Sequence, residues 1–155
     1  MINIRTNQKV FLKKILKDRN TASRETIQIV NRAATSVLTE VVRATPVDTG
    51  LARSNWVVSL GTGRADVIAP HSPGRKLGIA ETTNASIAIS MGSIVIAGRR
   101  RGVPIVITNS VYYISSLDRG SSPQQSAGFV DAAIRRGVSR LGRFGGNFRI
   151  FRGGI

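Results

Sequence analysis

The feature that most constrains the fold is a long apolar stripe at helical spacing in the first third of the chain. Small and aliphatic residues recur there at intervals of three and four, at Ile27, Val30, Ala33, Ala34, Val37, Leu38 and Val41. Residues at this spacing share one helix face, which predicts an amphipathic helix over residues 21–43. The helix is expected to end before Pro46, because proline moves the preceding residue out of the helical region. One helix cannot bury such a stripe alone, so we expect it to lie across a sheet.

A shorter amphipathic pattern precedes this helix, over residues 8–19. Its apolar face is formed by Phe11, Leu12, Ile15 and Leu16, and lysines fill the other face. Asn20 and Thr21 then offer a break or an N-cap. We therefore expect two successive helices, the first of them peripheral to the domain.

Short runs of β-branched and aromatic residues predict the strands. Residues 55–60 form one such run and residues 103–108 another, with Pro104 suited to a strand start or a sheet edge. Between them, residues 61–64 predict a turn, and residues 65–69 are a candidate for the returning strand of a hairpin. A loop over residues 70–78 follows.

Three further helices are predicted. Residues 82–98 alternate like a strand in part, but the length of the segment favours a helix. A short helix is expected over residues 112–117, and an amphipathic one over residues 127–141. The last helix should turn Phe129, Ala133, Ile134, Val138 and Leu141 inward and Arg135, Arg136 and Arg140 outward. The fold class is thus α+β: a long helix packed on a small antiparallel sheet, with additional helices.

The length of 155 residues suits one domain, which we place at residues 1–141. Residues 142–155 differ in composition and are interpreted as an extended arm. The arm interleaves Phe144, Phe148 and Phe151 with arginines and has no acidic residue. Its aromatic side chains could stack on nucleic-acid bases. We favour docking into a neighbouring subunit, because docking also explains why the arm is apolar.

The net charge of +15, from 23 Lys and Arg against 8 acids, points to an acidic partner. That partner is an acidic protein surface, nucleic acid, or both. Arginine binds carboxylate and phosphate in a bidentate manner. The candidate contact residues are therefore the clustered arginines Arg99, Arg100, Arg101, Arg135 and Arg136.

Catalytic patterns are not found in the sequence. Cysteine is absent, which excludes thiolate chemistry and cysteine–zinc sites. The single histidine, His71, has no acid beside it and no nucleophile motif is present, so a surface loop residue is the ordinary interpretation. The eight acids do not pair at a helix or strand spacing. Gly61–Arg64 lacks the rest of a phosphate-binding motif. We expect no enzyme, cofactor or metal, and no membrane span, since no apolar run approaches about 18 residues.

Residues 44–56 are interpreted as a structural turn between the long helix and the first strand. Pro46 directs the exit from the long helix, and Asp48, followed by Thr49, can accept backbone N–H bonds in an Asx-type turn. Gly50 permits positive φ. Trp56 then enters the strand as a large core or interface anchor.

The same string resembles the signature of the tail-completion and neck (head–tail joining) proteins of tailed phages. In that family a long helix is followed by a P-x-D-T-G-x-L-x-x-S-W-like turn and a strand. Pro46, Asp48, Thr49 and Gly50 match in place, whereas Leu51 and Ser54 lie one position earlier than in this pattern, so that Asn55 stands between Ser54 and Trp56. Residues 106–122 resemble the family's second segment, a strand followed by Asn-x-x-x-Tyr and Leu-Glu-x-Gly-x-Ser, with Asp118 in place of Glu. Residues 126–130 resemble the entry to its final helix.

This resemblance spans about residues 21–141 and implies a non-catalytic virion subunit. It implies a homo-oligomeric ring at the portal–tail junction, assembled in the host cytoplasm. The implied partners are portal or adaptor, tail-tube and tail-terminator proteins, with transient contact with genomic DNA. We expect residues 143–152 of the arm and residues 70–78 to make the intersubunit contacts. The alternative is a basic nucleic-acid-binding module not tied to a virion.

Overall fold

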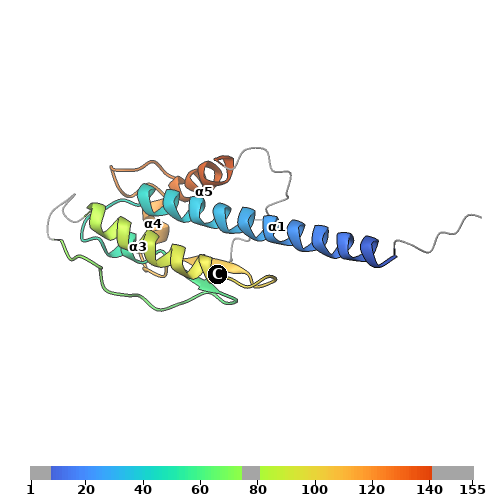
Figure 1. The fold of residues 1–155 in the computed structure, drawn as a ribbon. Coiled ribbons are helices and arrows are strands. Elements are labelled where there is room, and N and C mark those ends of the chain that lie inside the picture. The colour runs from blue at the N-terminus through green and yellow to red at the C-terminus, as the bar shows by residue number, and fades with distance from the viewer. Residues whose placement is uncertain (1–7, 75–80, 141–155) are drawn as a thin grey trace, which may run out of the picture.

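The computed structural model describes residues 8–74 and 81–140 (Figure 1). Its elements follow one another as α1 (Gln8–Ala44), α2 (Leu51–Ser54), β1 (Val57–Leu60), α3 (Glu81–Ala97), β2 (Ile105–Thr108), α4 (Ile114–Asp118) and α5 (Phe129–Ser139). Helices and a two-stranded antiparallel sheet occur together. The predicted α+β class with a long helix is confirmed. The predicted arm, including Phe144, Phe148 and Phe151, lies outside the described residues.

The long helix α1 is continuous through Asn20 and Thr21, so the prediction of two separate helices was wrong. No proline or glycine occurs between Gln8 and Ala44. Asn and Thr inside a helix cost only about 0.7 kcal/mol or less each, so they do not end it by themselves. The helix stops at Ala44, ahead of Pro46, as predicted. In Figure 1 the first turns of α1 extend well past the other elements.

The core lies around the C-terminal half of α1, where α3 and α5 both pack on this helix. Leu38, Val41 and Val42 are almost completely buried there. The other elements surround them with buried apolar side chains, namely Trp56, Val58, Ala85, Ala88, Ile96, Phe129 and Ala133. The apolar stripe that predicted the helix is therefore also the centre of the core.

The sheet pairs β1 with β2, with Val57 opposite Thr108 and Leu60 opposite Ile105. Residues 65–69 do not form the predicted returning strand, so that prediction was wrong. The Ile-Val-Ile-Thr run of β2 can bury apolar side chains against the core, whereas residues 65–69 contain Asp66, which pairs with Arg64 at the surface. Burial therefore decides which run pairs with β1.

The later helices agree with the predictions. Residues 81–97 are helical, and Arg99, Arg100 and Arg101 follow the helix end. The short helix α4 is followed by Gly120 at φ +91°. On α5 the predicted inner residues Phe129 and Ala133 are buried, whereas the arginines are exposed.

Gly137 brings α5 close to α1. A Cβ atom at this position would lie 2.6 Å from the Val37 Cα and 2.8 Å from the Val37 nitrogen. These are backbone atoms of a packed helix, so the helices would have to separate. We expect Gly137→Ala to destabilise the fold by about 2 kcal/mol, because overpacking outweighs the better helix propensity of alanine. Thermal unfolding should show a midpoint lowered by roughly 4–8 °C.

The matched control for this variant is Gly98→Ala. A Cβ atom there would meet its nearest neighbours at 3.6 Å and 3.7 Å, which is ordinary contact. Its stability should stay within about 0.5 kcal/mol of the wild type. A Gly137→Ala protein as stable as Gly98→Ala would contradict the close helix crossing.

Candidate functional site

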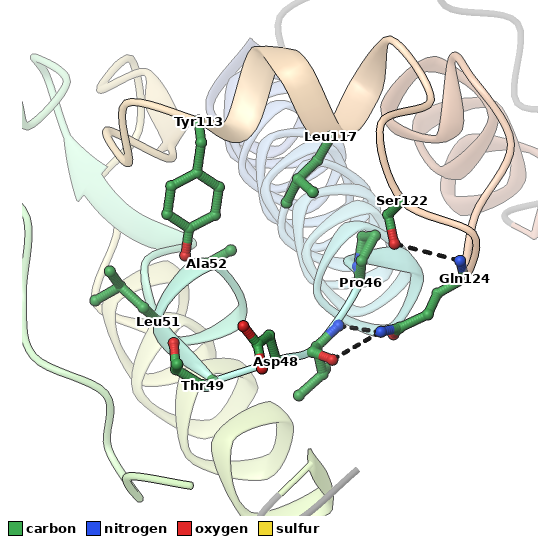
Figure 2. Close-up of a pocket in the computed structure, with 11 residues that line it drawn as sticks. Pro46, Asp48, Thr49, Leu51, Ala52, Tyr113, Leu117, Ser122 and Gln124 are labelled. Atoms are coloured by element: carbon green, nitrogen blue, oxygen red, sulfur yellow. Dashed lines mark hydrogen bonds between the residues drawn. The ribbon is translucent and has the colours of Figure 1, made fainter. Parts of the chain in front are cut away.

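The two sequence segments that carry the resemblance meet at one pocket of about 300 Å³ (Figure 2). One wall is the turn from Pro46 to Ala52, which joins α1 to α2. The other wall is formed by α4 and the loop after it, with the side chains of Tyr113, Leu117, Ser122 and Gln124. Segments far apart in sequence thus form one local structure.

Two amide side chains hold these walls together. The Val47 N–H donates to Oε1 of Gln124 at 2.9 Å, and Nε2 of Gln124 donates to the Val47 carbonyl at 2.8 Å. Figure 2 shows this paired contact. Nδ2 of Asn109 donates to the Ala52 carbonyl at 2.7 Å. Gln124 was missed in the sequence, because nothing local marks a glutamine that binds a distant backbone.

The turn itself uses Gly50 in the left-handed region, at φ +81°, as the N-cap of α2. Pro46 is buried, whereas Asp48 and Thr49 are exposed. The expected Asx-type hydrogen bonds to Asp48 are not found among residues 8–74 and 81–140. Burial raises the pKa of Tyr113, on the opposite wall, from its ordinary value.

A buried amide, Asn84, lies directly behind the turn. Its side chain is fully buried. Oδ1 accepts from the Ser54 hydroxyl at 2.9 Å and from the Ser72 N–H at 2.7 Å, and Nδ2 donates to the Ser72 carbonyl at 2.8 Å. The His71 N–H donates to the Ser54 hydroxyl at 3.2 Å. Asn84 therefore joins α3, α2 and the loop before residue 75 through one side chain.

Asn55 plays a similar role for the loop after β1. Its Nδ2 donates to the Ile68 carbonyl and its Oδ1 accepts from the Ile68 N–H, both at 2.8 Å. The side chain thus replaces the strand partner that residues 65–69 lack. This residue stands before Trp56 as the insertion relative to the family pattern.

The C-terminus of α1 is closed by Arg53 and Trp56. Arg53 is only 5% exposed, and its guanidinium donates to the carbonyls of Thr45 at 2.7 Å and Arg43 at 3.3 Å. A cation at this end satisfies terminal carbonyls and opposes the helix dipole. Nε1 of Trp56 donates to the Thr45 hydroxyl at 2.6 Å. Trp56 is thus a core anchor of the fold.

His71, the single histidine, lies in the loop between β1 and α3. It is half-buried, and desolvation lowers the pKa of its imidazole from the ordinary value. Within the described residues, no group of three or more His, Cys, Asp or Glu side chains is arranged to hold a metal ion. No helix in this part of the chain is long and apolar enough to cross a membrane.

The candidate basic residues fall into different environments. Nε of Arg99 donates to the Val103 carbonyl at 2.6 Å, and Arg100, Arg101 and Arg135 are exposed. Arg136 lies 3.2 Å from the buried carboxylate of Glu40. Arg140 reaches the same carboxylate at 2.9 Å. Through this ion pair with Glu40, Arg136 joins α5 to α1.

Comparison with known proteins does not identify relatives of this chain. No protein-family model, no curated protein and no solved structure matches it.

Proposed function

We propose that this protein is a structural subunit of a tailed-phage virion, which forms a ring in the neck at the portal–tail junction. The observation that carries the proposal is the meeting of the two resembling segments at one joint. Asn109 of the second segment donates to the Ala52 carbonyl of the first, and Gln124, two residues after the second segment, binds both backbone groups of Val47. Two chance matches would have no reason to contact each other in the fold. Their contact therefore favours a structure shared with the family that they resemble.

The use of the motif side chains supports a structural rather than a catalytic role. Arg53, Ser54 and Trp56 are buried and donate hydrogen bonds within the subunit. Gly50 supplies a left-handed turn. A catalytic site needs polar groups that converge on a substrate. Here Arg53 binds backbone carbonyls of the same chain, and Ser54 and Trp56 donate to the side chains of Asn84 and Thr45.

The surface charge supports an acidic neighbour in the virion. The net charge is +15, and Arg100, Arg101 and Arg135 are exposed. Such a surface fits acidic portal, adaptor, tail-tube or tail-terminator subunits, and it tolerates DNA passing through the ring. The same charge is the basis of the alternative, a nucleic-acid-binding module not tied to a virion.

Electron microscopy of intact particles of the virus that encodes this chain tests the proposal. We expect density for the chain in a ring between head and tail, with an antibody against the chain marking the same place. Absence of the chain from purified virions would overturn the proposal. In that case, DNA binding whose log affinity falls with log salt by roughly 0.9 per phosphate contact would support the alternative.

A further inference from the structure

The helix α3 places small residues against the subunit. Its buried face carries Ala85, Ala88 and Gly92, together with Asn84 and, near the end of the helix, Ile96. A Cβ atom at Gly92 would overlap the Leu38 side chain and lie 2.7 Å from Cγ2 of Val58. The small residues therefore let α3 approach α1 and β1 closely.

The outer face of the same helix carries large apolar side chains. Met91 is 54% exposed and Ile94 is 73% exposed. Ser86, Ser90 and Ala97 share this exposed face. The usual amphipathic helix turns its large apolar residues inward and charged ones outward. The outer face of α3 is therefore built to be covered by something other than this subunit.

After Glu81, its first residue, α3 carries no charged side chain, which bears on the kind of molecule that can cover its exposed face. No Lys, Arg, Asp or Glu occurs between Thr82 and Gly98, although the chain carries 23 Lys and Arg. Two copies with a charge of +15 repel each other over most of their surfaces. They can approach where at least one of the two meeting surfaces carries no charge, as residues 82–98 do. We therefore expect a second copy of this chain to cover the uncharged face of α3.

A complementary surface exists elsewhere on the same chain. An apolar groove of about 290 Å³ lies between α1, β2 and α5, and no residue of α3 lines it. Its walls are formed mainly by aliphatic residues, namely Val30, Val37, Ile105, Ile107, Ile134 and Val138. In Figure 1, α3 and α5 lie on different sides of α1. The ridge and the groove are therefore separate surfaces of one subunit.

The groove also holds a polar group that lacks a partner. Arg99 lines it, and Nη1 of Arg99 is buried without a hydrogen-bond partner among the described residues. Such a donor is costly to bury unless an acceptor is supplied. This atom is enclosed within a single copy of the chain, so the match between ridge and groove rests on their apolar character.

We propose that the exposed face of α3, centred on Met91 and Ile94, seats in the α1–β2–α5 groove of a second copy. The contact is heterologous, since one patch meets a different patch, and repetition of such a contact generates a ring when the rotation closes. This inference rests on the proposed function, because it supplies the subunit contact of the ring.

Thiol cross-linking of the full chain tests this contact without interference, because the chain has no cysteine. Ile94→Cys and Val138→Cys are made as separate variants, mixed, and treated with a short bifunctional thiol reagent. We expect a covalent dimer from the mixture and none from either variant alone. The chain carrying both substitutions should give a ladder of higher species. Tyr112→Cys, at an exposed site off both surfaces, replaces Ile94→Cys as the control and should not cross-link to Val138→Cys.

Other outcomes would overturn the contact. Cross-linking of Ile94→Cys to itself would indicate a symmetric α3–α3 pair. Cross-linking of Val138→Cys to Phe148→Cys instead would assign the groove to the C-terminal segment. Ile94→Glu provides a second measurement. It should abolish the higher cross-linked species, because a charge replaces the apolar contact. Its thermal midpoint should stay within 2–4 °C of the wild type, about 1 kcal/mol, since the Ile94 side chain is largely exposed. A ring seen in virions without the Ile94–Val138 cross-link would preserve the proposed function and remove this interface.

Discussion

Gly50→Ala is expected to destabilise the protein by about 3–4 kcal/mol, whereas Gly102→Ala should cost about 1–2 kcal/mol. The two glycines have nearly the same backbone conformation, with φ of +81° and +82°. Alanine in this left-handed region is strained at both positions. A Cβ atom at Gly50 would also overlap the amide nitrogen of Asn84 and lie 3.0 Å from its Cγ. Among the described residues, and apart from its chain neighbours, no atom lies within 4 Å of a Cβ at Gly102.

Denaturant unfolding of both variants measures this difference directly. The shared strain cancels between them, and the remaining difference is the cost of crowding Asn84. In an Asn84→Ala background, Gly50→Ala should lose most of its additional cost, because the atoms it overlaps are gone. Equal losses for Gly50→Ala and Gly102→Ala would contradict the tight packing of the turn on α3.

Asn84→Leu should destabilise the fold by about 3–5 kcal/mol. The substitution keeps the branching at Cγ and the number of side-chain heavy atoms but removes the hydrogen bonds to Ser54 and to both backbone groups of Ser72. Each buried group left without a partner costs about 1–3 kcal/mol. The loss should appear as a lower midpoint of denaturant unfolding with an unchanged slope.

Asn31→Leu is the matched control for the loss of a buried amide. Oδ1 of Asn31 is buried without a hydrogen-bond partner among the described residues, and Asn31 lies within α1. Leucine removes that unpaired oxygen and is a better helix former, so the change should be neutral or stabilising. If Asn31→Leu and Asn84→Leu had similar stability, the network around Asn84 would not hold the turn.

The helices were largely predictable, because their signals are local. The i, i+3, i+4 stripe from Ile27 to Val41 predicts the part of α1 that enters the core, and Pro46 predicts where it ends. The length of the segment at 82–98 distinguished helix from strand for α3. The error at Asn20 and Thr21 shows that a capping residue alone does not stop a helix in which each residue adds a hydrogen bond.

The pairing of the sheet was predicted less well. Residues 65–69 follow β1 directly and suggested a hairpin, but β1 pairs with residues 105–108. Strand pairing depends on which apolar run the core can bury, and this is settled by contacts distant in sequence. Asn55 then satisfies the backbone of Ile68 in place of a strand.

By itself, the sequence determined the type of most elements, the end of the long helix, the basic charge and the mechanical role of Gly50. These follow from the spacing of apolar residues, from the backbone preferences of proline and glycine, and from the numbers of basic and acidic residues. The tertiary structure alone decided that Asn84 and Gln124 hold the turn, and that Arg136 is shared with Glu40. It also decided that α3 turns its small residues inward. Each of these depends on which distant atoms lie within contact distance, and local sequence periodicity carries no information on that.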